Sequence, residues 1–287
     1  MAIYDRRYRG YDGPITPQNR RFLVLPRFAW AQVFRSRLFA GFFTMCFAWP
    51  VGAALWIYLH HNLKALESMG LNLTALAPID GEFFATFMGV QCFVLGGLLA
   101  LLVGPGLVSP DLANGALPLF LSRPLTRTGY AVGKMATLAI LISLITWIPG
   151  MLLFLLSSWL EGWSWFAANL RIGFAIVIGA GIWIVTISLL ALAASAVARR
   201  KVVAQTFLLG VIIFGGIAGQ AINQMFDTKL GFAFALPELM HTVWEGLYQV
   251  PLNAQLTPPI AWGMLFIICG LSIAVLARKL RAFEVVK

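Results

Sequence analysis

The residues of this sequence that could do chemistry are few, and they form no catalytic pattern. His60 and His61 offer imidazole nitrogens that could ligate a metal, but His241 is the only other histidine, and no carboxylate stands at ligand spacing. The sequence contains no H-E-x-x-H, no Asp-rich cluster and no G-x-S-x-G, so we predict no catalytic residue and no metal site. It also lacks G-x-x-x-x-G-K-[ST], the phosphate-binding loop through which many proteins hydrolyse ATP.

The most ordered pattern of polar residues lies in residues 103–134, which read VGPGLVSPDLANGALPLFLSRPLTRTGYAVGK. Ser-Pro-Asp at 109–111 predicts a helix start, with a capping hydroxyl, proline at the first helical position and a carboxylate in the first turn. Gly115 and Pro118 limit this helix to about two turns. Its apolar side chains need a surface to pack on, which is either the protein's own helices or a partner.

Six long apolar segments must position this loop. The chain is 60% hydrophobic and 11% charged, which excludes a soluble domain. A bilayer core of about 30 Å needs roughly 20 mainly apolar residues as a helix. We therefore predict an all-α polytopic membrane protein with six transmembrane helices, at residues 38–59, 83–104, 130–156, 170–198, 202–222 and 258–277.

The basic residues predict the orientation of these spans. All of the 21 lysines and arginines except Lys64, Arg171 and Lys229 fall on one side of the predicted membrane. Loops rich in lysine and arginine stay in the cytoplasm, so we expect both termini to be cytoplasmic. The net charge of +10 then reflects orientation and contact with anionic lipid headgroups, and it does not indicate nucleic acid. The predicted regions are a tail (1–37), the membrane domain (38–277), a cytoplasmic loop (105–129), an outer loop (223–257) and a basic tail (278–287).

The segment before the first span has the composition of a helix that lies in the membrane plane. Pro26 suits a helix start. Apolar residues share one face, and arginines can reach the headgroups, as in interfacial helices. The alternative is a cytoplasmic extension of the first span. The residues on which the interfacial assignment depends include Phe28, Trp30 and Phe34.

Other features are weaker. Pro50 and Pro149 predict kinks, and Gly215 and Gly219 permit close helix approach, which could serve a dimer contact. In the outer loop, apolar residues recur at helical spacing from Pro237 and predict a short helix. This helix either packs on the protein or covers an exit path. The notable polar residues within the spans are Gln91, Gln205 and Gln220.

The loop at 111–134 resembles that of the permease subunits of ABC-2-type transporters, also called type V exporters. In that family the loop carries an acidic residue, Gly-Thr-Leu, then Leu-Leu-Ser-Arg-Pro-Ile-Ser-Arg, and later Gly-Lys. Here the corresponding stretches are DLANGAL at 111–117, FLSRPLTR at 120–127 and GK at 133–134, with Ala116 where threonine is common. The topology fits along the whole chain.

The resemblance implies a function that uses ATP from outside the chain. A permease of this kind pairs with a second permease and binds two copies of a soluble ABC ATPase, which holds ATP and Mg²⁺, in the inner (plasma) membrane. The short helix would then be a coupling helix that the ATPase pushes. The resemblance implies that the residues coupled to the ATPase are Ser109, Pro110, Asp111, Leu112, Gly115 and Leu117. It also implies a cytoplasmic motif formed by Ser122, Arg123, Pro124, Arg127 and Lys134.

Several alternatives stay open at this point. Arg123 and Arg127 could pair with acidic ATPase residues or with lipid phosphate. The span interiors contain no Asp, Glu, Lys, Arg or His, because Lys134 and Arg171 lie near span ends. This absence argues against an ion-coupled transporter and favours export of a hydrophobic or amphipathic cargo. The second hypothesis is a membrane scaffold that recruits cytoplasmic proteins without transport.

Overall fold

The computed structural model describes residues 22, 24–62, 78–116, 126–198, 200–251 and 255–280, and every element in these ranges is helical. The six predicted spans are confirmed as helices long and apolar enough to cross a membrane. They run somewhat beyond the predicted bounds, most of all at the end of the second span. They comprise Arg37–His61, Gly81–Ala113, Arg127–Glu161, Trp163–Val197, Lys201–Phe226 and Pro258–Lys279.

The first three spans are interrupted, whereas the last three are continuous helices. The first consists of α2 (Arg37–Met45) and α3 (Ala48–His61). The second consists of α5 (Gly81–Gly89), the π-helix η3 (Val90–Gly96), α6 (Gly97–Val103) and α7 (Pro105–Ala113). The third consists of α9 (Arg127–Ile145) and α10 (Trp147–Glu161). The continuous spans are α11 (Trp163–Val197), α12 (Lys201–Phe226) and α14 (Pro258–Lys279).

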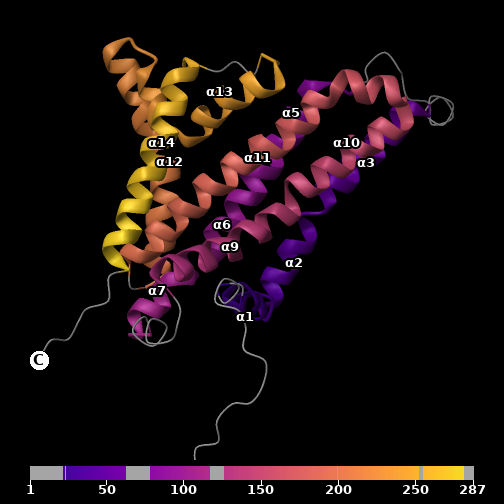
Figure 1. The fold of residues 1–287 in the computed structure, drawn as a ribbon. Coiled ribbons are helices and arrows are strands. Elements are labelled where there is room, and N and C mark those ends of the chain that lie inside the picture. The colour runs from indigo at the N-terminus through magenta and orange to yellow at the C-terminus, as the bar shows by residue number, and fades with distance from the viewer. Residues whose placement is uncertain are drawn as a thin grey trace, which may run out of the picture.

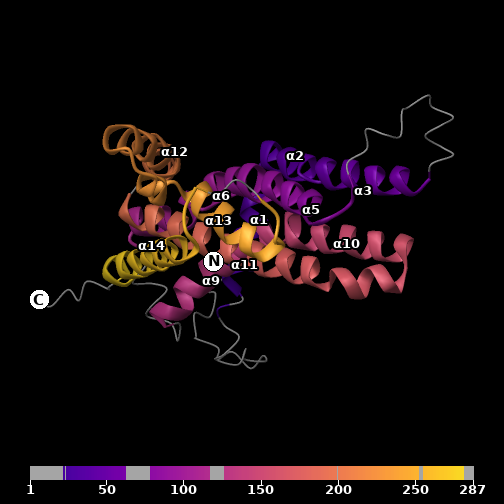
Figure 2. The same ribbon diagram turned by 90° about the horizontal axis from the view of Figure 1, so that it is seen from above.

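The helix α11 lies at the centre of the bundle. It contacts α7, α9, α10, α12, α13 and α14, and it is the span with the largest buried share. Seen from above, α3, α5 and α10 lie on one side of the molecule and α12 and α14 on the other (Figure 2). In Figure 1, α7 and α1 (Val24–Val33) lie at one end of the bundle and α13 (Leu236–Tyr248) at the other. We call these the α7 end and the α13 end.

Prolines explain two of the interruptions, and one glutamine bonds the backbone groups that these prolines leave unpaired. A helical proline has no N–H for the carbonyl four residues earlier. Pro50 and Pro149 therefore leave the carbonyl oxygens of Cys46 and Ile145 without their usual donors, and the helix breaks fall at these places, as the kink prediction requires. The side-chain amide of Gln91, in η3, donates to both oxygens, at 3.1 Å to Cys46. One buried side chain thus joins the interrupted regions of three spans.

A second glutamine does the same at the next proline. Pro105, at the start of α7, cannot donate to the carbonyl oxygen of Leu101. The side-chain amide of Gln205, on α12, donates to that oxygen at 3.3 Å. Neighbouring helices commonly supply such replacement donors, because an unpaired backbone group in the bilayer is costly. The side chains of Gln91 and Gln205 therefore supply hydrogen-bond donors to backbone carbonyl oxygens that proline leaves unpaired.

The outer connection folds back against α12. The 3₁₀-helix η4 (Leu230–Phe234) packs on α12. A Cβ on Gly215 would collide with the carbonyl oxygen of Phe234, and a Cβ on Gly219 with that of Gly231. The small residues that permit close approach are thus occupied within the chain, and the suggested dimer contact at this pair is wrong.

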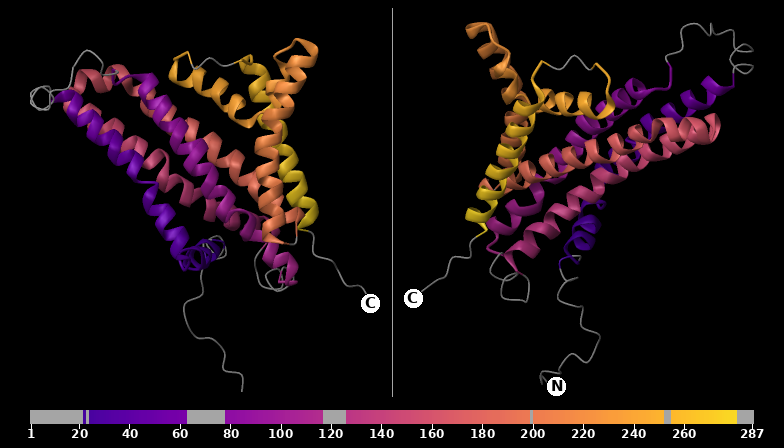
Figure 3. Two further views of the ribbon diagram at one scale, coloured as in Figure 1. Left: turned by 180° about the vertical axis from the view of Figure 1, so that it is seen from behind. Right: turned by 45° about the horizontal axis from the view of Figure 1, so that its top comes forward.

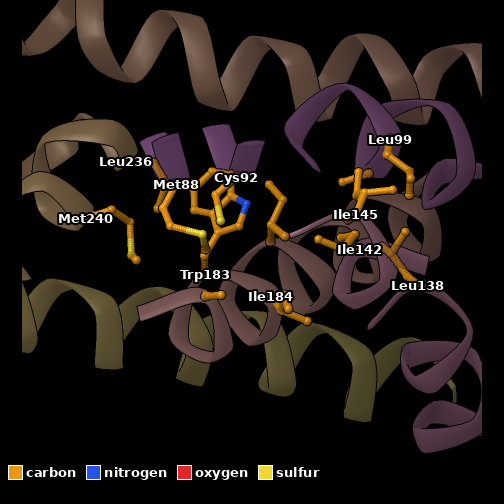
Figure 4. Close-up of a cluster of buried hydrophobic side chains, with 14 of the residues drawn as sticks. Met88, Cys92, Leu99, Leu138, Ile142, Ile145, Trp183, Ile184, Leu236 and Met240 are labelled. Atoms are coloured by element: carbon orange, nitrogen blue, oxygen red, sulfur yellow. The ribbon is translucent and has the colours of Figure 1, made fainter. Parts of the chain in front are cut away.

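The predicted helix in the outer connection is confirmed as α13, and it is part of the core. It lies across the α13 end between α5 and α14 (Figure 3). Leu236 and Met240 of α13 reach the same buried cluster as Met88 and Trp183 (Figure 4). Arg171 of α11 donates to the carbonyl oxygens of Gly246 and Leu247, at 2.7 and 3.0 Å, and so binds the C-terminal end of α13.

Candidate functional site

The helix predicted at 109–111 begins earlier than its capping pattern indicates. α7 begins at Pro105, directly after α6, and carries Pro110 in its interior, so the predicted start is wrong. Ser109 is buried, and its hydroxyl donates to the carbonyl oxygen of Pro105 at 2.6 Å. The hydroxyl therefore bonds backward within the helix and does not cap a helix start. The short helix is the terminal part of the second span.

The end of α7 lies where the sequence predicts it. The helix stops at Ala113, and Gly115 follows with a φ of 63°, a conformation that glycine adopts readily. Ala113, Asn114 and Gly115 are exposed, and we call them the α7 tip. Leu112, one residue earlier, is partly buried and packs against the core. Within the described residues the tip is thus open to another molecule, whereas Asp111 and Leu112 in the turn before it are partly buried.

Ser195 of α11 stabilises the body of α7. Its hydroxyl oxygen accepts from the backbone N–H groups of Val108 and Ser109, at 3.0 and 2.9 Å. The same hydroxyl donates to the carbonyl oxygen of Pro105 at 2.8 Å. The Ser195 side chain is fully buried, so water cannot reach this site. Its hydroxyl therefore pairs backbone groups of α7 that water cannot bond. Gly104 allows this contact, since a Cβ there would lie 2.6 Å from the Cβ of Ala191.

Two residues of the predicted site, Asp111 and Lys134, form a polar cluster with Tyr130 between α7 and α9. The carboxylate of Asp111 accepts from the Tyr130 hydroxyl at 2.6 Å and pairs with the Lys134 ammonium at 2.8 Å. The ammonium also lies 5.4 Å from the centre of the Tyr130 ring. The Lys134 and Asp111 side chains are only 12% and 19% exposed. We call this set the Asp111 cluster, and it joins α7 to α9.

The remaining residues of the predicted motif are placed only in part. Arg127 is the first residue of α9, directly after Thr126, whose hydroxyl accepts from the N–H of Gly129. Leu117, Ser122, Arg123 and Pro124 lie outside the described residues. The structure therefore brings together Asp111 and Lys134, which are 23 positions apart in the sequence, and adds Tyr130 and Ser195 to them.

The N-terminal helix packs on the same part of α9. The indole N–H of Trp30, in α1, donates to the carbonyl oxygen of Thr137 at 3.1 Å. Leu25 approaches α9 so closely that a Cβ on Gly133 would lie 2.7 Å from its Cδ1. One apolar face of α1 thus packs, partly buried, against protein, whereas Phe28 remains 71% exposed and Phe34, just after the helix, 42% exposed. The segment predicted to lie in the membrane plane therefore packs one side on α9, and its exposed side chains lie elsewhere on its surface.

Sequence reasoning missed the partners that are distant along the chain. Ser195 and Tyr130 belong to no sequence motif, and a single hydroxyl side chain within a span has many possible roles. His61 pairs with Glu161 at 2.8 Å and links the first span to the third. Among the described residues, no group of three or more His, Cys, Asp or Glu side chains could hold a metal ion.

Comparison with known protein families fits this geometry. A family model described as ABC-2 family transporter protein matches residues 30–284, which is nearly the entire described region. The chain belongs to this family. Comparison with curated proteins gives no match. As an ABC-2 family transporter protein, the chain is a multi-pass membrane protein and the permease component of an ABC transporter, which works with an ABC ATPase.

Proposed function

We propose that this chain is the permease subunit of an exporter that a separate ABC ATPase drives. The observation that carries the proposal is the arrangement of α7: an exposed tip on a base that is bonded to two other spans. Ser195 holds the base to α11, and the Asp111 cluster holds it to α9. In this proposal α7 contains the coupling helix, and the α7 tip is the part that the ATPase contacts.

The continuity of α7 with the second span explains how a push would travel. A force on the α7 tip would act along α6 without an intervening loop. The bonds of Asp111 and Ser195 would move α9 and α11 with it, because packed helices shift as units between discrete arrangements. ATP-driven closure of the ATPase would thereby rock three spans between inward- and outward-facing states.

The rest of the proposed assembly follows from charge and family. The distribution of lysine and arginine supports a cytoplasmic α7 end, and the membrane that we propose for the chain is the inner (plasma) membrane. Two permease chains and two ATPase copies would form the complex, and the ATPase would bind ATP and Mg²⁺. Lipid headgroups would surround the exposed Phe28 of α1 and the exposed Phe34, which directly follows this helix.

A hydrophobic or amphipathic cargo suits the composition of the spans. The described ion pairs, Lys134 with Asp111 and His61 with Glu161, both lie near helix ends. Coupling ions are usually bound by ionisable groups near the middle of the membrane. ATP hydrolysis is therefore the energy source that we propose, and an apolar molecule or a lipid-like one is the proposed class of cargo.

The test compares two matched variants, in each of which an exposed alanine is replaced by glutamate. Ala113→Glu places a carboxylate on the α7 tip, and Ala277→Glu places one at an exposed position near the same end of α14. Each variant is purified from native membranes in mild detergent, and the eluate is assayed for a bound ABC ATPase by mass spectrometry and for vanadate-sensitive ATP hydrolysis.

We expect the wild type and Ala277→Glu to retain a stoichiometric ATPase, and Ala113→Glu to lose most of it. Equal retention of the ATPase by both variants would refute the proposal that the ATPase contacts the α7 tip. If the wild type carries no nucleotide-binding partner, the coupling proposal fails and a scaffold that recruits other cytoplasmic proteins becomes the better account.

A further inference from the structure

An aromatic groove lies between the first and second spans, on the α13 side of their interruptions. Trp49 and Trp56 project from α3, and the small residues Gly52 and Ala53 lie between them in the sequence. A Cβ on Gly52 would meet nothing within 4 Å, so the space between the two indoles is open. Phe83, Thr86 and Phe87 of α5 line the opposite wall. We call this space the tryptophan groove.

The dimensions and lining of the groove are those of a small-molecule site. Its volume is 570 Å³, within the range of roughly 300–1,000 Å³ that is usual for pockets that hold drug-sized ligands. Trp49 and Trp56 remain 43% and 37% exposed, so much of both indoles is available for contact. Aromatic faces of this kind attract both apolar groups and cations.

Two carboxylates make the groove negative at one end. Asp80 and Glu82, at the start of α5, both line it. One oxygen of Asp80 accepts from the N–H groups of Glu82 and Phe83, at 3.0 and 3.1 Å, so its position is fixed. Within the described ranges, neither carboxylate forms an ion pair. As far as the described residues show, the groove therefore combines an apolar body with an end that carries two carboxylates and no basic side chain.

We propose that the tryptophan groove binds a small lipophilic cation. The apolar part of the ligand lies between Trp49 and Trp56, and the positive centre lies near Asp80 and Glu82, where indole faces and carboxylates both attract it. A phospholipid headgroup fits less well, because its phosphate would meet the same two carboxylates. Binding to the groove is independent of ATP coupling, so it can be measured on the permease alone.

The probe is tritiated tetraphenylphosphonium, and the protein is the full chain in detergent. Binding is measured by scintillation proximity, with no ATPase or nucleotide present. Neutral triphenylphosphine oxide serves as the uncharged competitor. The groove variants are Glu82→Gln and Trp56→Leu. Their matched controls are Glu238→Gln, in the first turn of α13, and Trp159→Leu, an exposed indole of α10.

We expect saturable binding of the cation to the wild type and to both controls. Glu82→Gln and Trp56→Leu should each weaken it by about three- to tenfold, as expected for one partly solvated charge or one cation–π contact. Gel-filtration profiles matching the wild type show that the variants are folded. Non-saturable binding overturns the proposal, and so does an equal loss in groove and control variants. Displacement by triphenylphosphine oxide as strong as by the unlabelled cation overturns the role of the carboxylates.

Discussion

Replacing Gln91 with methionine removes the amide that bonds the carbonyl oxygens of Cys46 and Ile145. Side-chain hydrogen bonds within membranes average about 0.6 kcal/mol in double-mutant cycles, whereas a buried polar group left unpaired costs about 1–3 kcal/mol. The amide oxygen of Gln91 has no hydrogen-bond partner among the described residues, so methionine also removes one buried unpaired acceptor. The expected net loss is about 1–2 kcal/mol of unfolding free energy.

The buried cysteines supply the assay. Cys46 and Cys92 are fully buried, so a thiol-reactive fluorescent dye reaches them as the protein unfolds on heating in detergent. Gln91→Met should lower the unfolding temperature, and Gln220→Met, at an exposed position of α12, should leave it nearly unchanged.

A double-mutant cycle tests the proposed cause. Alanine at positions 50 and 149 restores the N–H groups that prolines lack, so the carbonyl oxygens of Cys46 and Ile145 regain helical donors. In a Pro50→Ala, Pro149→Ala background, Gln91→Met should therefore lose most of its effect. An undiminished effect in that background would refute the idea that Gln91 compensates for the two prolines.

Three further outcomes are expected. Lys134→Met leaves the Asp111 carboxylate without its ion-pair partner and should destabilise the protein by about 2 kcal/mol in the same thermal assay; an unchanged unfolding temperature would show that the pair contributes nothing. Gly219→Ala should disrupt η4 because the added Cβ collides with a backbone oxygen, whereas Gly216→Ala, whose Cβ meets nothing within 4 Å, serves as its control and should be tolerated. Cysteine at Lys229, in the outer connection, should react with an impermeant maleimide on intact cells; reaction only after lysis would reverse the proposed orientation.

The spans were predictable because the bilayer imposes length and composition on each of them independently. About 20 apolar residues identify a span without knowledge of its neighbours, and Pro50 and Pro149 marked helix interruptions for the same reason, since the missing N–H is a local property. The end of α7 at Ala113, two residues before Gly115, also depended on local backbone preference alone.

The start of α7 was not predictable from local sequence. Ser-Pro-Asp has the composition of a helix start, but Pro110 is tolerated inside α7, where Ser195 bonds the backbone from a helix more than 80 residues later. The partners of Asp111 were hidden in a similar way, because a tyrosine at the start of a span has many possible roles. Patterns within one segment reveal its backbone, whereas contacts between segments decide which side chains share a site.

The bond between Arg171 and the end of α13 has a consequence for biogenesis. Its acceptors are 75 and 76 positions further along the chain. At a synthesis rate of about 5–20 residues per second, the arginine waits roughly 4–15 s before its acceptors are made. During that interval the Arg171 side chain lacks the two carbonyl acceptors that it has in the folded protein. Completion of the bundle at this end is therefore a late event of translation, and a chain truncated before residue 246 would reach the membrane with α11 inserted and this arginine still without those carbonyls.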